Sequence, residues 1–444
     1  MTARSPLYRW LVVVLLAAIG GLNYGDRSAI ASVFPLLRAE FHLSDVALGA
    51  VGSCFLWAYA PASLLAGVLA DRLFRSRLIA WSLAGWSVVT VLTGLVTNVP
   101  ELLLTRVLLG VLEAAFVPAA IALIADYHDG ATRATAMGLF AGGSALGVVL
   151  GGTGLGYMGD HWGWRTGFFF LGGAGLALAA VAQRLLRDAP AAAAGNDSPR
   201  VEFAVGPRLG SILRIRSYRI ILGASMAVAV SNWTFLNWLP LYFKETYRSS
   251  LAEAGFAGTF LHQGAAIVAG LLGGIFSDRL ARGKPWRRMT IQSLCCFMAA
   301  PLLGIFLWRS PALGTLVLCA LSYSFLLCFG TSNATPTTCE LLPNRLRGTA
   351  IGLSNAANCF AGGIGVLGAG LLKARFGLGG VFAGISGMIV LSASLMLLGA
   401  RYFLPADLRR ARLADLGGLG PEPVGATNTR PPIEPGPAGL VCGS

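Results

Sequence analysis

Four ionisable side chains lie inside apolar stretches of this chain, and their types suggest a site that handles charge. Asp26 and Arg27 stand in the first stretch, and Arg106 and Glu113 stand in the fourth. An ionised side chain at the centre of a bilayer costs at least ~2.5–3.5 kcal/mol, so such groups persist when they pair or face water or a ligand. Two guanidinium groups with two carboxyl groups therefore predict anion binding and proton transfer.

Arg106 is the residue expected to hold the anion. Because Arg106 and Glu113 are seven residues apart, on a helix they share a face within about 20° and lie about 10.5 Å apart along the axis. A guanidinium presents a rigid fork that donates two parallel hydrogen bonds to a carboxylate, and it never loses its charge. The pattern thus predicts that Arg106 binds the carboxylate of an organic anion.

The two carboxyl groups are expected to carry protons. A carboxyl group in apolar surroundings retains its proton, whereas an adjacent arginine favours the ionised form. A carboxyl group that gains or loses an arginine partner can therefore exchange a proton, a role that we assign first to Glu113 and second to Asp26. Arg27 is either a second anchor for the anion or the partner of these carboxylates. The alternative is an ion-pair network that only holds two helices together.

Neutral polar groups are expected to complete the site, because no charged residue lies deep in an apolar stretch of the second half. Such groups suit the hydroxyls of a substrate, although any one asparagine could instead form hydrogen bonds between helices. The residues expected at the site besides the four charges are Tyr24, Asn23, Asn237, Trp238, Asn355 and Asn358.

The elements that position these residues are membrane-spanning helices. The 444 residues have a mean hydropathy of +0.68 and only 12% are charged, about half the share of a soluble protein. Twelve apolar stretches of spanning length occur in two sets of six, which predicts an all-α membrane protein with twelve transmembrane helices in two pseudo-symmetric six-helix bundles. The expected parts are the first bundle (1–187), a cytoplasmic linker (188–216), the second bundle (217–404) and a disordered cytoplasmic tail (405–444).

The net charge of +14 reflects the membrane topology. The basic residues gather in alternate loops, which are expected to face the cytoplasm, and this pattern predicts that both termini are cytoplasmic. A nucleic-acid partner would need a basic face on a soluble domain, which the pattern does not contain. Neither a nucleotide-binding loop nor a zinc or nucleophile motif occurs. We therefore expect no enzyme activity and no cofactor, with the proton as coupling ion, and a monomer surrounded by membrane lipid in the cytoplasmic (inner) membrane.

One loop pattern, G-x-x-x-D-R-x-x-R, occurs at the equivalent place of each half. Glycine allows two helices to approach, and an aspartate at a helix end can pair with basic groups of a neighbouring helix. We expect a cytoplasmic gate that holds the outward-open state, although a plain basic cytoplasmic loop would also explain the arginines. The residues are Gly67, Asp71, Arg72 and Arg75 in the first half and Gly274, Asp278, Arg279 and Arg282 in the second.

With these motifs, residues 8–404 resemble the major facilitator superfamily. The runs Asn23-Tyr24-x-Asp26-Arg27 and Arg106-x-x-x-Gly110-x-x-Glu113 resemble its anion:cation symporter group. That resemblance implies a central cavity, alternating access by rocking of the halves, proton-titrating carboxylates at Asp26 and Glu113, and cavity-facing arginines at Arg27 and Arg106. The expected function is proton-coupled symport, as uptake, of a small organic anion such as a sugar acid or other carboxylate.

Two other functions compete with this interpretation. The chain is also similar to Spinster-like carriers, through Leu123-Ile124-Ala125-Asp126-Tyr127 and Gly163-Trp164-Arg165, which implies proton-coupled transport or export of lysolipids or other amphipathic lipids. A closed polar cavity would favour the sugar acid, and a lateral apolar opening would favour the lipid. The third possibility is a receptor or scaffold that keeps the fold without transport.

Overall fold

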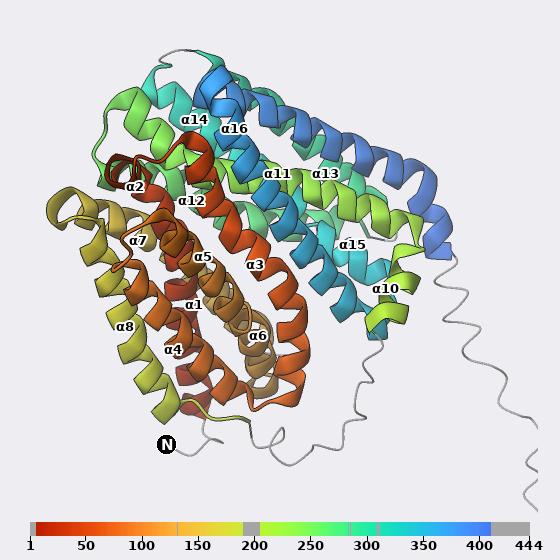
Figure 1. Cartoon of the computed structure of the whole chain (residues 1–444). Coiled ribbons are helices and arrows are strands. Elements are labelled where there is room, and N and C mark those ends of the chain that lie inside the picture. Colours follow the sequence, from red (N-terminus) through yellow and green to blue (C-terminus); the bar gives the residue numbers. More distant parts are fainter. Residues whose placement is uncertain are drawn as a thin grey trace, which may run out of the picture.

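The computed structural model describes residues 6–130, 132–189, 205–282, 284, 286–308 and 311–409. Most of the expected linker and most of the expected tail therefore lie outside the described residues. Helical structure continues to Arg409, five residues beyond the expected end of the second bundle at 404. Figure 1 shows the chain as two groups of helices, with the first half drawn in red to yellow and the second in green to blue.

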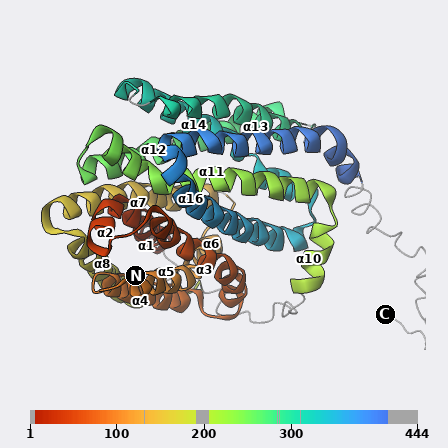
Figure 2. The same cartoon turned by 45° about the horizontal axis from the view of Figure 1, so that its top comes forward.

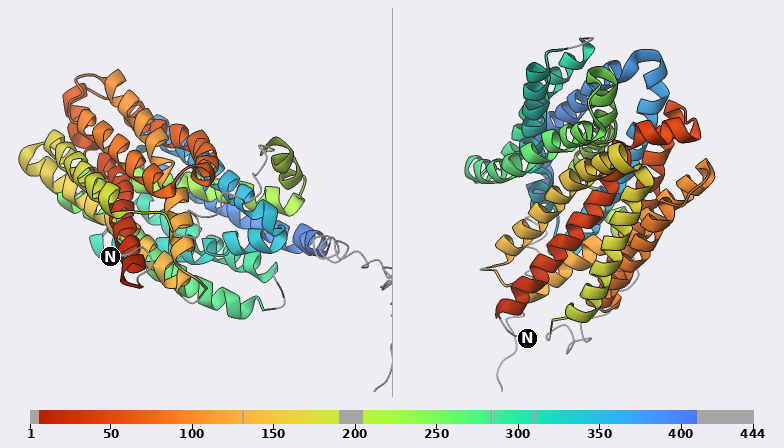
Figure 3. Two further views of the ribbon diagram at one scale, coloured as in Figure 1. Left: turned by 90° about the horizontal axis from the view of Figure 1, so that it is seen from below. Right: turned by 90° about the vertical axis from the view of Figure 1, so that its left-hand side faces the viewer.

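The first half contains six apolar spans, the fourth of them in two segments, and a short helix after the first span. Its helices are α1 (Pro6–Ser32), α2 (Phe34–Phe41), α3 (Asp45–Arg72), α4 (Arg75–Thr93), α5 (Val99–Glu113), α6 (Phe116–Tyr127), α7 (Arg133–Trp162) and α8 (Trp164–Leu185). Two views at right angles show them as one bundle beside the second half (Figure 3).

The second half repeats this arrangement after the short helix α10 (Val205–Leu213). Its helices are α11 (Arg216–Tyr247), α12 (Leu251–Leu280), α13 (Trp286–Ala299), η1 (Ala300–Leu307), α14 (Leu313–Thr331), α15 (Ala334–Leu341), α16 (Asn344–Leu398) and η2 (Gly399–Phe403). Eleven helices in the described residues are long and apolar enough to cross a membrane. The last of them is broken at Gly377, where φ is 66° and ψ is 170°. Counting its two parts separately gives twelve spans, which confirms the predicted fold class.

The fourth span of each half is broken at the same point by a proline. Pro118 follows the end of α5 at Glu113 and the start of α6 at Phe116; its ring clashes with the carbonyl four residues earlier and it has no N–H to donate. Pro336 interrupts the tenth span in the same way, because it follows the end of α14 at Thr331 and the start of α15 at Ala334. The break in the first half places Glu113 at the end of a helix segment in the middle of the span.

The two halves meet along the seams α7–α12 and α3–α16, which lie side by side in Figure 2. At the first seam a Cβ on Gly255 would lie 2.3 Å from the carbonyl oxygen of Gly152, and a Cβ on Gly156 would lie 2.3 Å from that of Leu251. At the second seam Ser53 donates a hydrogen bond to the carbonyl of Gly363 at 2.7 Å. Glycine is required at Gly255 and Gly156 because the backbones touch there.

Four charged side chains join the halves at the end of the bundles away from the termini, here called the far end. Arg38 and Asp45 come from the first half, and Glu245 and Lys373 come from the second. Arg38 pairs with Asp45 and, at 3.1 Å, with Glu245, while Lys373 lies 3.0 Å from Asp45 and 2.6 Å from Glu245. Each cation thus contacts one anion of its own half and one of the other half. Of these four ion pairs, the two between the halves must break when the halves separate here.

The short helix that carries Arg38 is fastened to its own half. Trp164 Nε1 donates a 2.6 Å hydrogen bond to Glu40, and Arg165 pairs with the same carboxylate. Burial raises the pKa of Glu40, but the hydrogen bonds from Trp164 and Arg165 outweigh it, so the pKa lies below its ordinary value. The far end is therefore pinned within the first half as well as across the two halves.

We predict that Lys373→Gln opens the far end more often. The substitution leaves Asp45 and Glu245 to share Arg38, and the loss of a charge pair whose lysine is only 9% exposed should cost about 1–2 kcal/mol, a ~5- to 30-fold change in the ratio of the two conformations. Spin-label distances across the far end would measure this ratio. Arg165→Gln is the matched control, because its partner Glu40 lies in the same half; equal effects of both variants would contradict the prediction.

The residues of the expected gate lie at the opposite end, and those that the structure describes form no ion pair between the halves there. The ribbons of the two halves diverge toward the end with the N-terminus and α10 (Figure 1), and a Cβ on Gly67 or Gly274 would meet no other element within 4 Å. These glycines do not bring helices together in this structure, because the halves are closed at the far end instead of the end that carries the pattern. The role of the pattern as a cytoplasmic gate therefore stays a prediction.

The other residues of the pattern form contacts within their own halves or are exposed. Arg75 pairs with Asp126, and Asp278 accepts a 2.8 Å hydrogen bond from Arg288, the first-turn arginine of the next span. Arg279 and Arg282 are exposed. The side chains of Asp71 and Arg72 lie outside the described part of the chain.

Candidate functional site

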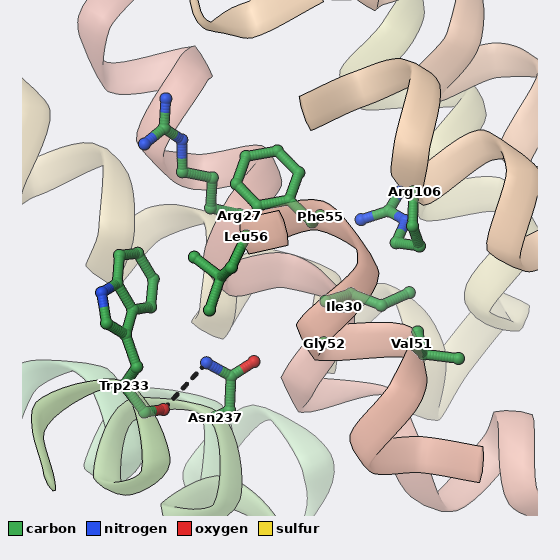
Figure 4. A pocket seen from close by; sticks show the side chains of 9 residues that line it. All are labelled: Arg27, Ile30, Val51, Gly52, Phe55, Leu56, Arg106, Trp233 and Asn237. Atoms are coloured by element: carbon green, nitrogen blue, oxygen red, sulfur yellow. Dashed lines mark hydrogen bonds between the residues drawn. The ribbon is translucent and has the colours of Figure 1, made fainter. Parts of the chain in front are cut away.

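A small pocket lies between the halves, in the part of the molecule where three of the four predicted charges converge. Its space, including the part open to solvent, is about 290 Å³. Helices α1, α3 and α5 of the first half face α11 of the second half across it (Figure 4). The lining residues are Arg27, Ile30, Val51, Gly52, Phe55, Leu56, Arg106, Trp233 and Asn237.

Arg27 is the partner of Glu113. Its Nε donates to Glu113 Oε2 at 2.8 Å, and its terminal nitrogen donates to Asn23 Oδ1 at 2.7 Å. The two side chains of the ion pair are 7% and 1% exposed. Of the two roles predicted for Arg27, the structure therefore shows the pairing role directly, and the place of Arg27 in the pocket wall keeps it within reach of a ligand.

Three aromatic rings surround the Arg27 guanidinium. Its central carbon lies 4.8 Å from the Tyr24 ring centre, 5.3 Å from that of Phe55 and 4.5 Å from that of Tyr59. The negative faces of such rings attract a cation, most strongly away from water. This enclosure stabilises the positive charge of Arg27 when Glu113 is neutral. The predicted residue Tyr24 thus contacts Arg27, and the contribution of Phe55 and Tyr59 was not foreseen.

Arg106 is buried and forms no direct ion pair within the described residues, although Glu113 and Asp26 are near enough for their charges to act on it. Only 2% of the residue is exposed, and the hydrogen bond that it donates, to Thr93 Oγ1, is 3.5 Å long. Its Nε has no hydrogen-bond partner in the described structure. Figure 4 shows its guanidinium at the opposite side of the pocket from Arg27. A buried guanidinium without a direct ion pair is costly, which makes Arg106 a candidate residue for binding an anion.

Asp26 faces away from the pocket. It is 3% exposed, and its nearest hydrogen-bond donor is Thr90 Oγ1 of α4 at 3.4 Å. Asp26 Oδ1 and Glu113 Oε1 are buried without a partner in the described residues. Asp26 and Arg27 thus diverge toward different helices, as adjacent positions on a helix require. The two carboxyl groups lie behind the pocket wall, where each has a free oxygen that could hold a proton.

The predicted neutral residues of the second half separate into two groups. Asn237 lines the pocket and donates a 2.9 Å hydrogen bond to the carbonyl of Trp233, which Figure 4 draws as a dashed line. Trp238 does not line it: its indole donates to the Val366 carbonyl at 3.1 Å and packs on Phe34. Placing Trp238 in the pocket was therefore wrong, because adjacent helical residues point about 100° apart.

Trp233 takes the place expected of Trp238. It precedes Asn237 by four residues, so the two side chains share one face of α11, and both line the pocket. Asn355 and Asn358 of α16 are not among the lining residues; Asn355 is exposed and Asn358 Oδ1 is buried without a partner in the described structure. The structure thus does not bring this pair to the pocket in its present conformation. In the described part of the chain, no group of three His, Cys, Asp or Glu side chains is placed to hold a metal ion.

Two six-helix bundles around a pocket with buried charges define a multi-pass membrane protein of the carrier type. The family model described as Major Facilitator Superfamily matches residues 16–366, and the chain belongs to this superfamily. The predicted resemblance is therefore confirmed at the level of the family.

Relatives of known name resemble this chain at 25–27% identity. A probable galactarate/D-glucarate transporter of Escherichia coli (strain K12) is 27% identical over 62% of this chain and 67% of its own length. A D-galactonate transporter of Escherichia coli O6:H1 is 25% identical over 82% and 88%. An MFS-type efflux pump of Mycolicibacterium smegmatis is 27% identical over 92% and 95%.

The fold also resembles solved structures. A bacterial homologue of the human lysosomal transporter Spinster, in an inward-facing and unoccupied conformation, superposes with a TM-score of 0.73 at 21% identity. The match covers 93% of this chain and 99% of the other. Both groups expected from the sequence motifs are thus represented among the similar proteins. The sugar-acid transporters resemble this chain in sequence, whereas the Spinster homologue resembles it in fold.

Proposed function

We propose that this protein is a secondary transporter that carries a small organic anion together with protons. The observation that carries the proposal is the contrast between the two arginines. Arg27 forms a direct ion pair with Glu113, whereas Arg106 is buried at the pocket without a direct ion pair in the described residues. An external carboxylate fits Arg106 because the guanidinium fork can bind it in two parallel hydrogen bonds. The names of the sugar-acid relatives support the same substrate class.

The balance of charge in the site supports coupling to protons. With both carboxyl groups ionised, Asp26 and Glu113 offset Arg27 and Arg106, so the four formal charges sum to zero. A bound monoanion then leaves one net negative charge in a medium where uncompensated charge is costly. One proton on Glu113 restores neutrality, and a dianion would require a second proton on Asp26.

Proton binding also changes what Arg27 can do. Once Glu113 is neutral, its attraction for Arg27 weakens, while the rings of Tyr24, Phe55 and Tyr59 keep the cation in place. Arg27 lines the pocket, so it is then free to bind the second carboxylate of a diacid. Rocking of the halves would then switch access to the loaded pocket from the far end to the end that carries the termini.

The proposed orientation follows from the charges of the loops, which place both termini in the cytoplasm. In that orientation the ribbons of the two halves diverge toward the cytoplasm, and the four-charge cluster joins the halves on the outer side. We propose uptake through the cytoplasmic (inner) membrane by a monomer. The two arginines that line the pocket favour a small anion over the lysolipid of the competing interpretation.

Uptake by proteoliposomes tests the proposal. Galactonate serves as the monoanion and galactarate as the dianion, each with an imposed pH gradient or an imposed membrane potential. Because each anion is expected to enter with as many protons as it has charges, uptake should follow the pH gradient and be nearly independent of the potential. Uptake driven by the potential alone, or binding of lysophospholipid in place of both acids, would refute the proposal; protein-free liposomes are the control.

A further inference from the structure

Trp233 belongs to the wall of the pocket that the second half supplies, across from Arg106 in Figure 4. Arg27 and Arg106 belong to the first half, whereas Trp233 and Asn237 project from α11 of the second half (Figure 4). An anion whose carboxylate lies on Arg106 must extend its remaining carbons toward this wall. The indole offers a flat apolar surface and the neighbouring amide offers hydrogen bonds, which together suit a chain that carries both C–H and hydroxyl groups.

The indole of Trp233 packs against Gly362 of α16. A Cβ on Gly362 would lie 2.2 Å from Trp233 Cδ1 and 2.7 Å from its Cγ. Any side chain at residue 362 would therefore push the ring from its present place. Helices α11 and α16 both belong to the second half, so this contact is kept when the halves rock against each other. Trp233 is consequently a fixed wall of the second half.

The next residue of α16 offers an internal comparison. A Cβ on Gly363 would lie 2.4 Å from Nε1 of Trp57, which comes from α3 of the first half. Trp57 donates a 3.2 Å hydrogen bond to the carbonyl of Phe360 and is not among the residues that line the pocket. Two adjacent glycines thus seat two indoles, of which only one borders the pocket.

We infer that Trp233, held against Gly362, determines the length of the organic anion that the pocket accepts. The inference rests on the proposed function. With the indole packed against Gly362, the space between Arg106 and the Trp233 ring has a fixed end. Displacement of the ring by a side chain at residue 362 shortens that space, and removal of the ring lengthens it. The two changes therefore act on long and short anions in opposite directions.

The test compares two hydroxy-acid monoanions of different length, three-carbon glycerate and six-carbon galactonate, by their dissociation constants for the purified protein. Trp233→Ala should shift the ratio of affinities at least about tenfold in favour of galactonate, and Gly362→Ala should shift it about tenfold in favour of glycerate, as expected when a pocket gains or loses room for a few atoms. Gly363→Ala is the matched control, with the same change in size one residue away, and should leave the ratio within about twofold.

A double variant checks the proposed contact itself. In the Trp233→Ala background, Gly362→Ala should no longer change the ratio, because the ring atoms that the new methyl group would strike are absent. Equal shifts from Gly362→Ala and Gly363→Ala, or shifts in the same direction from Trp233→Ala and Gly362→Ala, would overturn the inference. If the unaltered protein binds neither acid, the proposed function fails; if it binds both and the ratio stays constant in all variants, only the inference fails.

Discussion

Glu113→Gln is expected to abolish accumulation of the anion against its gradient while exchange of the anion across the membrane continues. Glutamine keeps an oxygen that can accept the hydrogen bond from Arg27 Nε, now 2.8 Å long, but it cannot bind and release a proton. The variant therefore preserves the shape of the site and removes the proton carrier. An imposed pH difference of one unit drives at most about tenfold accumulation per coupled proton, and this ratio should fall to about 1.

The measurement is made in proteoliposomes, with steady-state accumulation and counterflow exchange of radiolabelled galactonate recorded on the same preparation. Glu101→Gln is the matched control, because it makes the same substitution in the same helix at an exposed position beside Thr97 and Asn98. Its accumulation ratio should equal that of the unaltered protein. If Glu113→Gln still concentrates galactonate in response to the pH difference, Glu113 is not the essential proton carrier.

The sequence was sufficient to find the charged part of the site, because intramembrane charges are rare and costly. Arg27 and Arg106 both reach the pocket, and Glu113 lies directly behind it on Arg27. The sequence left the partner of Arg27 open, since the distance between α1 and α5 depends on packing that spacing within one helix does not determine. The aromatic enclosure of Arg27 depends on the same packing.

The neutral part of the site was harder to predict for a different reason. Trp238 was chosen because it stands beside Asn237 in the sequence, but neighbours on a helix face different directions. The spacing of four between Trp233 and Asn237 would have identified the correct tryptophan. Asn355 and Asn358 share a face of α16 that does not line the pocket in this structure. Whether this face reaches the pocket depends on how the halves are arranged, and the spacing of residues within one helix does not specify that arrangement.

The sequence contains a second internal repeat. Arg133-x-Thr-Ala-x-Gly138 begins α7, and Arg347-x-Thr-Ala-x-Gly352 lies in the first turns of α16. In both halves the arginine Nε donates a 3.0 Å hydrogen bond to the carbonyl five residues earlier, that of His128 and that of Leu342. Each arginine thus ties the start of a span to the end of the preceding one. The same comparison of halves would have shown the paired breaks before Pro118 and Pro336.

Arg106→Lys is expected to weaken binding of the anion by about 10- to 150-fold. Lysine keeps the positive charge that offsets the buried carboxylates, so the folded protein should tolerate it better than alanine, but its ammonium group cannot form two parallel hydrogen bonds with a carboxylate. Loss of one charge-assisted hydrogen bond costs about 1.5–3 kcal/mol, which corresponds to the stated range. The size of the effect depends on the burial of Arg106, of which 2% is exposed.

Thermal unfolding with and without galactonate measures this loss. At a ligand concentration 100 times the dissociation constant, a bound ligand stabilises the folded protein by about 2.7 kcal/mol, and for a variant that binds 100-fold more weakly the same concentration gives about 0.4 kcal/mol. Arg165→Lys, at the far end and outside the pocket, should retain the full stabilisation. An unchanged shift in Arg106→Lys would show that the anion is held elsewhere, and Arg27, the other guanidinium in the pocket wall, would then be the residue to test.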